Sequence, residues 1–106
     1  MTKFHTAKEM LKAAAAAGLQ IKVWGDDNDA PEYFGANPAA AWQAVAGQDE
    51  AEITLHNADG TRVKGGWAFL LADGPGTCDP QETVVDYSAD GWISDWWNAN
   101  REAILA

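Results

Sequence analysis

Hydrophobic residues recur along the first quarter of the chain with the period of a helix and then with that of a strand. Thr6-Ala7-Lys8-Glu9 has the form of a capping box, so the sequence predicts a helix that begins at about Ala7 and runs to Ala17. Gly18 then supplies the left-handed residue that ends such a helix. Apolar side chains at every second position over residues 19–24 are typical of a half-buried strand.

The segment after this strand predicts a second helix, with a short strand before it. Residues 31–35 favour a strand through Tyr33 and Phe34, although the run is too brief for its period to decide. Asn37-Pro38 is typical of a helix start, because an N-cap is followed by proline at a position that needs no backbone amide. This helix is expected to end at Gly47.

A β-hairpin is predicted in the centre of the chain. Apolar and polar residues alternate over residues 51–56, and Asn57-Ala58-Asp59-Gly60 has the composition of a tight turn. The alternation resumes after the turn, and there the side chains expected to face the core are Trp67, Phe69 and Leu71.

The last third of the chain predicts a loop, a strand and a helix. Glycine and proline mark residues 73–80 as the loop, and residues 83–87 resume as a strand. Asp90 is the predicted cap of a helix whose broad apolar face holds Trp92, Ile93, Trp96 and Trp97. Strands joined by short turns pair antiparallel. The predicted fold class is therefore α+β, a small antiparallel sheet of three to four strands with about three helices packed on one face, in a single domain over residues 1–106.

The net charge of the chain excludes some classes of binding partner. Sixteen acidic residues against seven basic residues give a formal charge of −9. Direct binding to nucleic acid or to an anionic membrane surface is not expected, because both surfaces are themselves densely negative. The charge is also uneven, since residues 1–22 carry +3 and residues 23–106 carry −12.

Several acidic residues fall in groups on predicted loops and strand edges, where their carboxylates project into water. The candidates for contact with a partner are Asp26, Asp27, Asp29, Asp73, Asp79 and Glu82. A wall of carboxylates can compete with DNA for the basic channel of a nucleic-acid-binding protein. Solubility alone explains the same charge, because a net charge away from zero serves any small domain. Both interpretations stay open at this point.

Six tryptophans in 106 residues require burial in a core or in an interface. Those of the last predicted helix, Trp92, Trp96 and Trp97, span a wider arc than one stripe facing a sheet needs. At least one of these indoles is therefore expected at the surface, as a contact for a protein partner. The alternative is that the terminal helix is buried on several sides.

Candidate catalytic and metal-binding residues are few. Cys78, His56 and an aspartate have the residue types of a nucleophilic triad, but no local catalytic motif surrounds Cys78. No cysteines or histidines have zinc-ligand spacing, and Asp26-Asp27-Asn28-Asp29 lacks the turn glycine of a calcium loop. The sequence thus assigns no catalytic residue, no metal ligand and no cofactor. A small hydrolase built around Cys78 or paired carboxylates is the least favoured function.

The expected compartment follows from cysteine content and hydropathy. A single cysteine cannot form an internal disulfide, and no apolar run approaches the ~20 residues that cross a membrane. The first five residues also lack the hydrophobic segment of a signal peptide. We therefore expect a cytoplasmic protein, as a monomer or a homodimer.

In layout, most of the chain resembles small acidic proteins encoded by phages and plasmids. The resemblance lies in the short capped first helix, the strand and turn Ile21-Lys22-Val23-Trp24-Gly25-Asp26, the hairpin over residues 57–71, and Val84-Val85-Asp86-Tyr87-Ser88 before a tryptophan-bearing helix. It implies an inhibitor of host defence, such as an anti-restriction or anti-CRISPR protein, some of which mimic nucleic acid.

Two functional hypotheses follow from the sequence. In the first, a non-enzymatic acidic protein of a mobile element docks through its carboxylates on a basic host protein, a nucleic-acid-binding component of a defence system. In the second, the chain is a protein-interaction module that uses the exposed tryptophans of its C-terminal helix.

Overall fold

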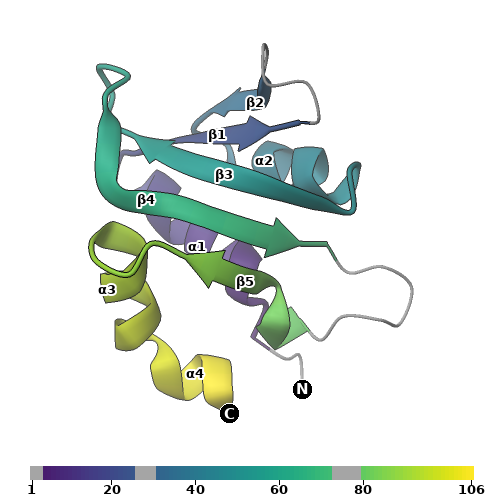
Figure 1. Cartoon of the computed structure of the whole chain (residues 1–106), viewed down its shortest axis with the longest axis vertical. Helices are drawn as coiled ribbons and strands as arrows, with labels where there is room; N and C mark the ends of the chain where they lie inside the picture. Colours follow the sequence, from purple (N-terminus) through teal and green to yellow (C-terminus); the bar gives the residue numbers. More distant parts are fainter. Residues whose placement is uncertain (1–3, 26–30, 73–79) are drawn as a thin grey trace.

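The computed structural model describes residues 4–25, 31–72 and 80–106, which form an antiparallel β-sheet with helices beneath it. The strand order is β2-β1-β3-β4-β5, and every neighbouring pair is antiparallel (Figure 1). The strands are β1 (Gln20–Trp24), β2 (Pro31–Gly35), β3 (Glu50–His56), β4 (Arg62–Leu71) and β5 (Val84–Tyr87). The sheet exceeds the predicted three to four strands, because the short β2 segment pairs with β1 as an edge strand.

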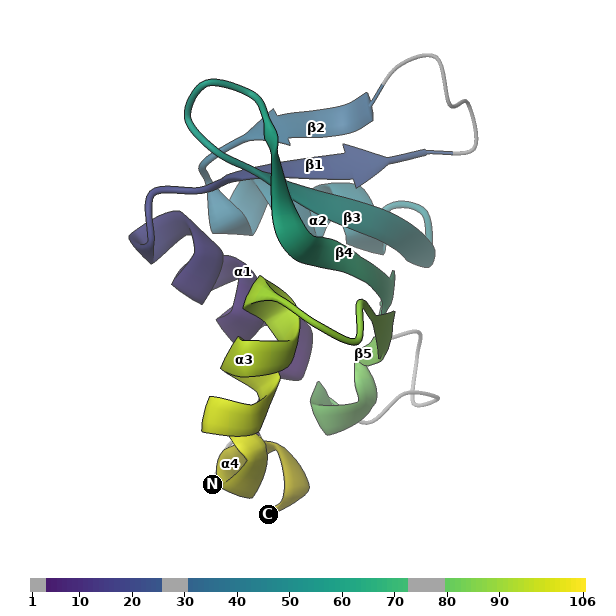
Figure 2. The ribbon, with the colours of Figure 1, turned by 60° about the vertical axis from the view of Figure 1, so that its left-hand side comes forward.

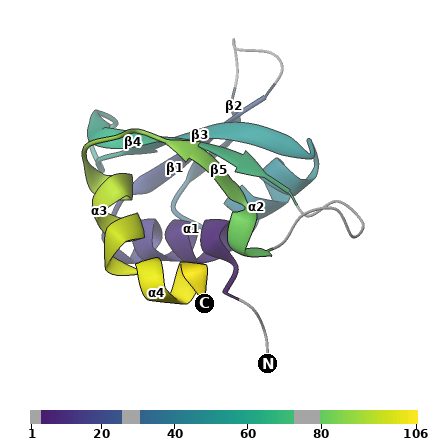
Figure 3. The ribbon, with the colours of Figure 1, turned by 60° about the horizontal axis from the view of Figure 1, so that its bottom comes forward.

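The helices formed by the described residues all lie on one face of the sheet (Figure 3). They are α1 (Thr6–Ala16), α2 (Pro38–Ala46), α3 (Trp92–Ala99) and α4 (Arg101–Leu105), with a short 3₁₀ turn, η1 (Pro80–Glu82), before β5. Helix α2 packs against β1 and β2, α1 against β1, and α3 against β4 and α1 (Figure 2). The predicted α+β class with helices on one face of an antiparallel sheet is confirmed. None of these helices is long and apolar enough to cross a membrane.

The hydrophobic core lies between the helices and the inward side of the sheet. Alternate residues of the central strands point into it, and the fully buried ones are Ile21, Val23, Ile53, Leu55, Ala68 and Leu70. The helices contribute Met10, Leu11, Val45 and Ile93, which are also fully buried. The covered side of the sheet is therefore aliphatic and closely packed.

Two predicted helix boundaries are confirmed by their cap geometry. Gly18 follows α1 with a φ of 83°, and the Leu19 backbone N–H donates to the Ala14 carbonyl at 3.0 Å. At the start of α2, the Asn37 side-chain oxygen accepts from two backbone amides of the first turn at 3.0 and 3.2 Å, with Pro38 at the first helical position. Both signals are local, so the sequence alone was sufficient to locate them.

The start of α1 differs from the predicted capping box. His5 is the N-cap, because its Nδ1 accepts from the Lys8 backbone N–H at 3.2 Å. Thr6 is fully buried, and its hydroxyl donates to the Gln81 carbonyl at 2.8 Å. The threonine hydroxyl is thus used to join α1 to η1, a contact between segments distant in sequence that a local motif cannot reveal.

Strand β4 faces the opposite way from the prediction. Trp67, Phe69 and Leu71 are expected in the core but are half-buried on the side of the sheet away from the helices. The helices instead cover the intervening residues, which are Gly66, Ala68 and Leu70. Because side chains alternate with a period of two, a change of one position exchanges the whole set between the two faces.

Two backbones approach each other closely where α3 begins against β4. Gly65 has a φ of 68°, and Gly91, immediately before α3, has a φ of 130°. A side chain at either glycine would collide with the backbone beside the other, so α3 begins directly against β4. Only small residues fit beneath the helix at this crossing, and the bulky Trp67 lies on the other side of the strand.

The C-terminal segment is two helices where the sequence predicts one. Asp90 does not cap α3, whose N-cap is Gly91 and carries no side-chain hydrogen bond. The break falls at Asn100, whose side-chain amide donates to the Trp96 carbonyl at 2.9 Å. Asn100 thereby satisfies a carbonyl at the end of α3, and the chain restarts as α4.

Candidate functional site

None of the described helices lies over the second face of the sheet, which we call the open face (Figure 3). The described side chains that strand alternation and register place on it include Gln20, Lys22, Trp24, Phe34, Glu50, Glu52, Thr54, His56, Trp67, Phe69, Leu71 and Asp86. Four of these side chains are Trp or Phe and three are carboxylates. A sheet face that meets only water normally carries polar side chains, so this aromatic content calls for an explanation.

The aromatic side chains shield polar groups of β3. Thr54 is only 4% exposed and His56 only 6% exposed, although both lie on the open face. The ring of Phe34 packs on that of His56 with 5.3 Å between centroids, and Trp67 is the register partner of Thr54 on β4. The aromatic residues therefore act as a thin covering layer over the centre of the sheet.

A chain of hydrogen bonds beneath this layer fixes Trp24. The Trp24 indole N–H donates to Thr54 Oγ1 at 3.0 Å, and Thr54 Oγ1 lies 2.8 Å from His56 Nε2. His56 Nδ1 lies 3.0 Å from the Gly60 carbonyl, which can only accept. In the neutral ring Nδ1 then carries the proton, and the Thr54 hydroxyl donates to Nε2. Both nitrogens of His56, a candidate for a catalytic triad, are thus engaged in structural hydrogen bonds.

Lys22 completes the aromatic layer with a positive charge. Its Nζ lies 4.3 Å from the ring centroid of Trp24 and 5.3 Å from that of Phe34. At these distances the negative ring faces attract the ammonium group. Phe34 nevertheless remains 46% exposed, so this part of the open face is accessible to a second molecule.

A concavity of about 250 Å³ lies beside this layer, at the end of β1 and the start of β3. The residues that line it are Trp24, Gly25, Gln48, Glu50, Ala51, Glu52 and Phe69. Phe69 is flanked in register by Glu52 on β3 and Asp86 on β5. Among the described residues, neither Glu50 nor Glu52 forms an ion pair or a side-chain hydrogen bond. The concavity thus combines aromatic walls with unpaired negative charge.

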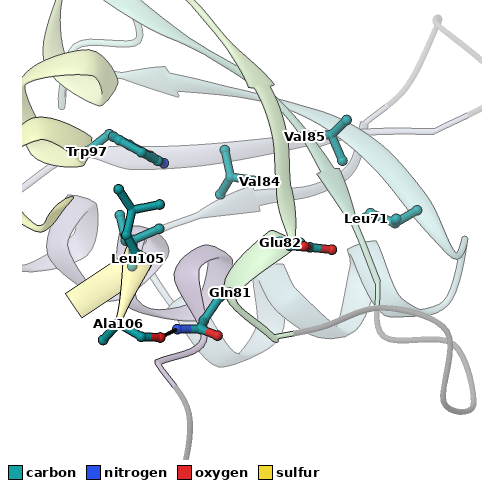
Figure 4. Close-up of a pocket in the computed structure, with 9 residues that line it drawn as sticks. Leu71, Gln81, Glu82, Val84, Val85, Trp97, Leu105 and Ala106 are labelled. Carbon is teal, nitrogen blue, oxygen red and sulfur yellow. Dashed lines mark hydrogen bonds between the residues drawn. The ribbon is translucent and has the colours of Figure 1, made fainter. Parts of the chain in front are cut away.

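A second, larger pocket of about 630 Å³ lies between α4, β5 and η1 (Figure 4). Its lining residues are Leu71, Gln81, Glu82, Val84, Val85, Trp97, Ile104, Leu105 and Ala106. The Gln81 side-chain amide donates to the Ala106 carbonyl at 2.7 Å. Leu105 and Val85 are 64% and 56% exposed. Two predicted contact residues, Glu82 and Trp97, are among the residues that line this pocket.

The three tryptophans of α3 are all half-buried. Trp92 and Trp96 pack against the core, and Trp96 also stacks on Phe4 with 6.3 Å between centroids. Trp97 stacks on Tyr87 at 6.0 Å. All three indoles are therefore partly exposed, and none of them is freely exposed.

The predicted acidic contact residues are described only in part. Glu82 is exposed, whereas Asp26, Asp27, Asp29, Asp73 and Asp79 lie outside the described residues, as does Cys78. The candidate carboxylates that the sequence did not single out are Glu50, Glu52 and Asp86. Glu52 lies on the polar side of the strand predicted over residues 51–56, but its place beside Phe69 follows only from the orientation of β4.

Within the described parts of the chain, no three His, Cys, Asp or Glu residues are close enough to hold a metal ion. Hydrogen bonds from the Thr61 backbone N–H and hydroxyl lower the pKa of Asp59, which lies in the hairpin turn and not on the open face. Comparisons of the chain with protein-family models, with curated proteins and with solved structures gave no match. The resemblance to acidic proteins of mobile elements therefore stays a prediction.

Proposed function

We propose that this chain is a non-catalytic binding protein that docks on a basic protein partner through the open face of its sheet. The observation that carries the proposal is the pairing of aromatic side chains with carboxylates on one surface, as at Phe69 between Glu52 and Asp86. The Glu52 side chain has no ion-pair or hydrogen-bond partner among the described residues, and that of Asp86 accepts only from the Tyr87 backbone N–H at 2.9 Å. Aromatic residues supply contact area in interfaces, and carboxylates steer a positively charged partner toward it. The net charge of −9 acts in the same direction over longer distances.

The partner class proposed is a basic protein that handles nucleic acid, and the proposed consequence is inhibition. Such a protein carries a surface of Lys and Arg that neutralises phosphates. Carboxylates on the open face form ion pairs with those Lys and Arg side chains. The chain and DNA therefore compete for the same surface of the partner. The predicted resemblance to inhibitors of host defence is consistent with this role. It indicates that the partner is a protein of the bacterial host.

The second candidate is a protein-interaction module centred on the pocket that contains Trp97 and Glu82. The exposed apolar side chains of Leu105 and Val85 at its rim favour it. A partner bound there would be held by apolar contact, with weak dependence on salt. Salt dependence therefore separates the two candidates.

A capture experiment with matched variants tests the proposal. The chain is immobilised and exposed to bacterial lysate at low and high salt, as the wild type and as two double variants that each remove two negative charges. Glu52→Gln with Asp86→Asn alters the open face, whereas Asp95→Asn with Glu102→Gln alters exposed carboxylates on α3 and α4. Each captured protein is purified, and its binding is measured in competition with duplex DNA.

We expect the wild type and the helix variant to capture the same basic protein equally well. The open-face variant should capture it at least tenfold less well, and duplex DNA should displace it. Capture that is insensitive to salt and to the open-face variant would overturn the proposal. If Trp97→Ala then abolished that capture while the fold remained intact, the pocket at α4 would be the binding site instead.

A further inference from the structure

We infer that the concavity between Trp24 and Phe69 receives an arginine side chain of the partner, an inference that rests on the proposed function and specifies its central contact. Its shape, walls and charge suit a guanidinium group better than any other common side chain. The volume of about 250 Å³ is well beyond the roughly 30 Å³ that one water molecule occupies in the liquid. An extended side chain with a planar head therefore has room to enter.

The aromatic walls attract cations, as the structure itself illustrates. Lys22 Nζ already lies 4.3 Å from the centroid of the Trp24 ring. Lys22 does not line the concavity, so it leaves that space to another cation. Arginine is favoured over lysine because its planar, weakly hydrated guanidinium stacks on aromatic rings such as those of Trp24 and Phe69.

The carboxylates supply the second half of the recognition. Glu50 and Glu52 are two positions apart on β3 and lie on the same side of the strand, about 7 Å apart along it. Both are exposed and line the concavity. They repel one another until a cation lies between them, and the five N–H donors of a guanidinium can reach both. Binding of arginine thereby relieves an unbalanced local charge.

The concavity is held in shape before any ligand arrives. The Trp24 indole is fixed by its hydrogen bond to Thr54, which continues to His56 and Gly60. The Gln48 side-chain amide donates to the Trp24 carbonyl at 3.3 Å and to the Ala44 carbonyl at 3.1 Å, which ties the end of β1 to α2. Little ordering is required on binding, so a single arginine can make a large contribution to affinity.

The test uses a defined probe and no partner protein. The ¹⁵N-labelled chain is titrated by NMR with a blocked tripeptide, N-acetylglycyl-arginyl-glycinamide, and with its lysine and citrulline counterparts. Citrulline keeps the shape of arginine and removes its charge. The six indole N–H resonances report on each tryptophan separately, with that of Trp24 assigned from a Trp24→Phe variant. Calcium chloride is titrated as well, to detect a simple divalent-cation site.

We expect the arginine peptide to produce saturable shifts of the Trp24 indole and of the backbone amides of Glu52 and Phe69. The lysine peptide should bind several-fold more weakly, and the citrulline peptide should give no shift. Glu50→Gln with Glu52→Gln should weaken arginine binding at least tenfold, while the charge-matched pair Asp95→Asn with Glu102→Gln should leave it unchanged. Phe69→Leu should weaken it several-fold with the carboxylates intact.

Small, non-saturable shifts spread evenly over all acidic residues would overturn the inference, as would equal binding of lysine and arginine or calcium binding at the same resonances. The outcome is separable from that of the capture experiment. A partner lost with Glu52→Gln and Asp86→Asn, in a chain that does not bind the arginine peptide, retains the proposed function and removes the arginine site. Peptide binding at Trp24 without capture of a basic protein retains the arginine site and removes the proposed function.

Discussion

The two faces of this one sheet are covered in different ways. On the inward face, helices bury aliphatic and small side chains such as Ile53 and Ala68 completely. On the open face, polar residues such as Thr54 and His56 are nearly as buried, yet what covers them is a layer of aromatic side chains. The difference teaches that a single layer of rings can replace a layer of helices and still leave a surface with which a partner can make contact.

The largest expected effect comes from comparing matched truncations on the two faces. Ile53→Ala opens a cavity under the helices and should lower the free energy of unfolding by about 2–5 kcal/mol. Phe34→Ala removes a larger side chain that is already about half exposed, and should cost no more than about 1 kcal/mol. Urea denaturation of both variants measures the contrast. Equal costs would mean that the aromatic layer is as much a core as the helical one.

How far the sequence predicts this fold depends on whether a signal is local. The caps at Gly18 and Asn37 and the hairpin turn depend on neighbouring residues, and each was predictable. The orientation of β4 was not, because it depends on packing against segments distant in the sequence, such as Gly91, which is 26 positions from Gly65. Thr6 was misread for the same reason, since its hydroxyl bonds to Gln81 and not within its own helix.

The candidate site was harder to predict than the fold. An aromatic residue in a strand is by default assigned to the core, and that default hid the cluster of Trp24, Phe34, Trp67 and Phe69. Acidic residues were ranked by their grouping along the chain, which favours loops over strands. Glu52 and Asp86 become notable only when register places them on either side of Phe69.

The second-largest effect is expected from a substitution at Thr54, which tests whether the hydrogen bonds under the aromatic layer are required for stability. Thr54→Val keeps the shape of the side chain but removes the hydroxyl that Trp24 and His56 share. Leaving buried polar groups without partners should lower the free energy of unfolding by about 1–3 kcal/mol. Thermal or urea denaturation measures the loss, and the Trp24 indole resonance should move in the same variant. An unchanged stability would show that water can enter beneath the aromatic layer and restore the bonds.

A smaller effect is expected from the cation in the layer. Lys22→Gln removes the attraction between Nζ and the rings of Trp24 and Phe34, and should destabilise the fold by about 0.5–1 kcal/mol. Lys64→Gln is the matched control, because Lys64 is an exposed lysine on β4 for which the described residues provide no ring or ion-pair partner. Denaturation midpoints of the two variants at equal salt give the difference. If both variants lost the same stability, the change in net charge and not the ring contact would be the cause.

The smallest effect concerns the hairpin turn between β3 and β4, which belongs to neither face. The Thr61 backbone N–H and hydroxyl donate to Asp59 Oδ1 at 3.0 and 2.7 Å, and these bonds lower the pKa of Asp59 below its ordinary value of 3.8. A carboxyl whose pKa is lowered on folding contributes stability above its unfolded pKa, and the contribution disappears as pH falls through the folded pKa. NMR titration of the Asp59 carboxyl should give a midpoint below 3.8, and Thr61→Ala should raise that midpoint toward the ordinary value, because only the backbone donor remains. If Thr61→Ala left the midpoint unchanged, the hydroxyl of Thr61 would not contribute to the lowered pKa of Asp59.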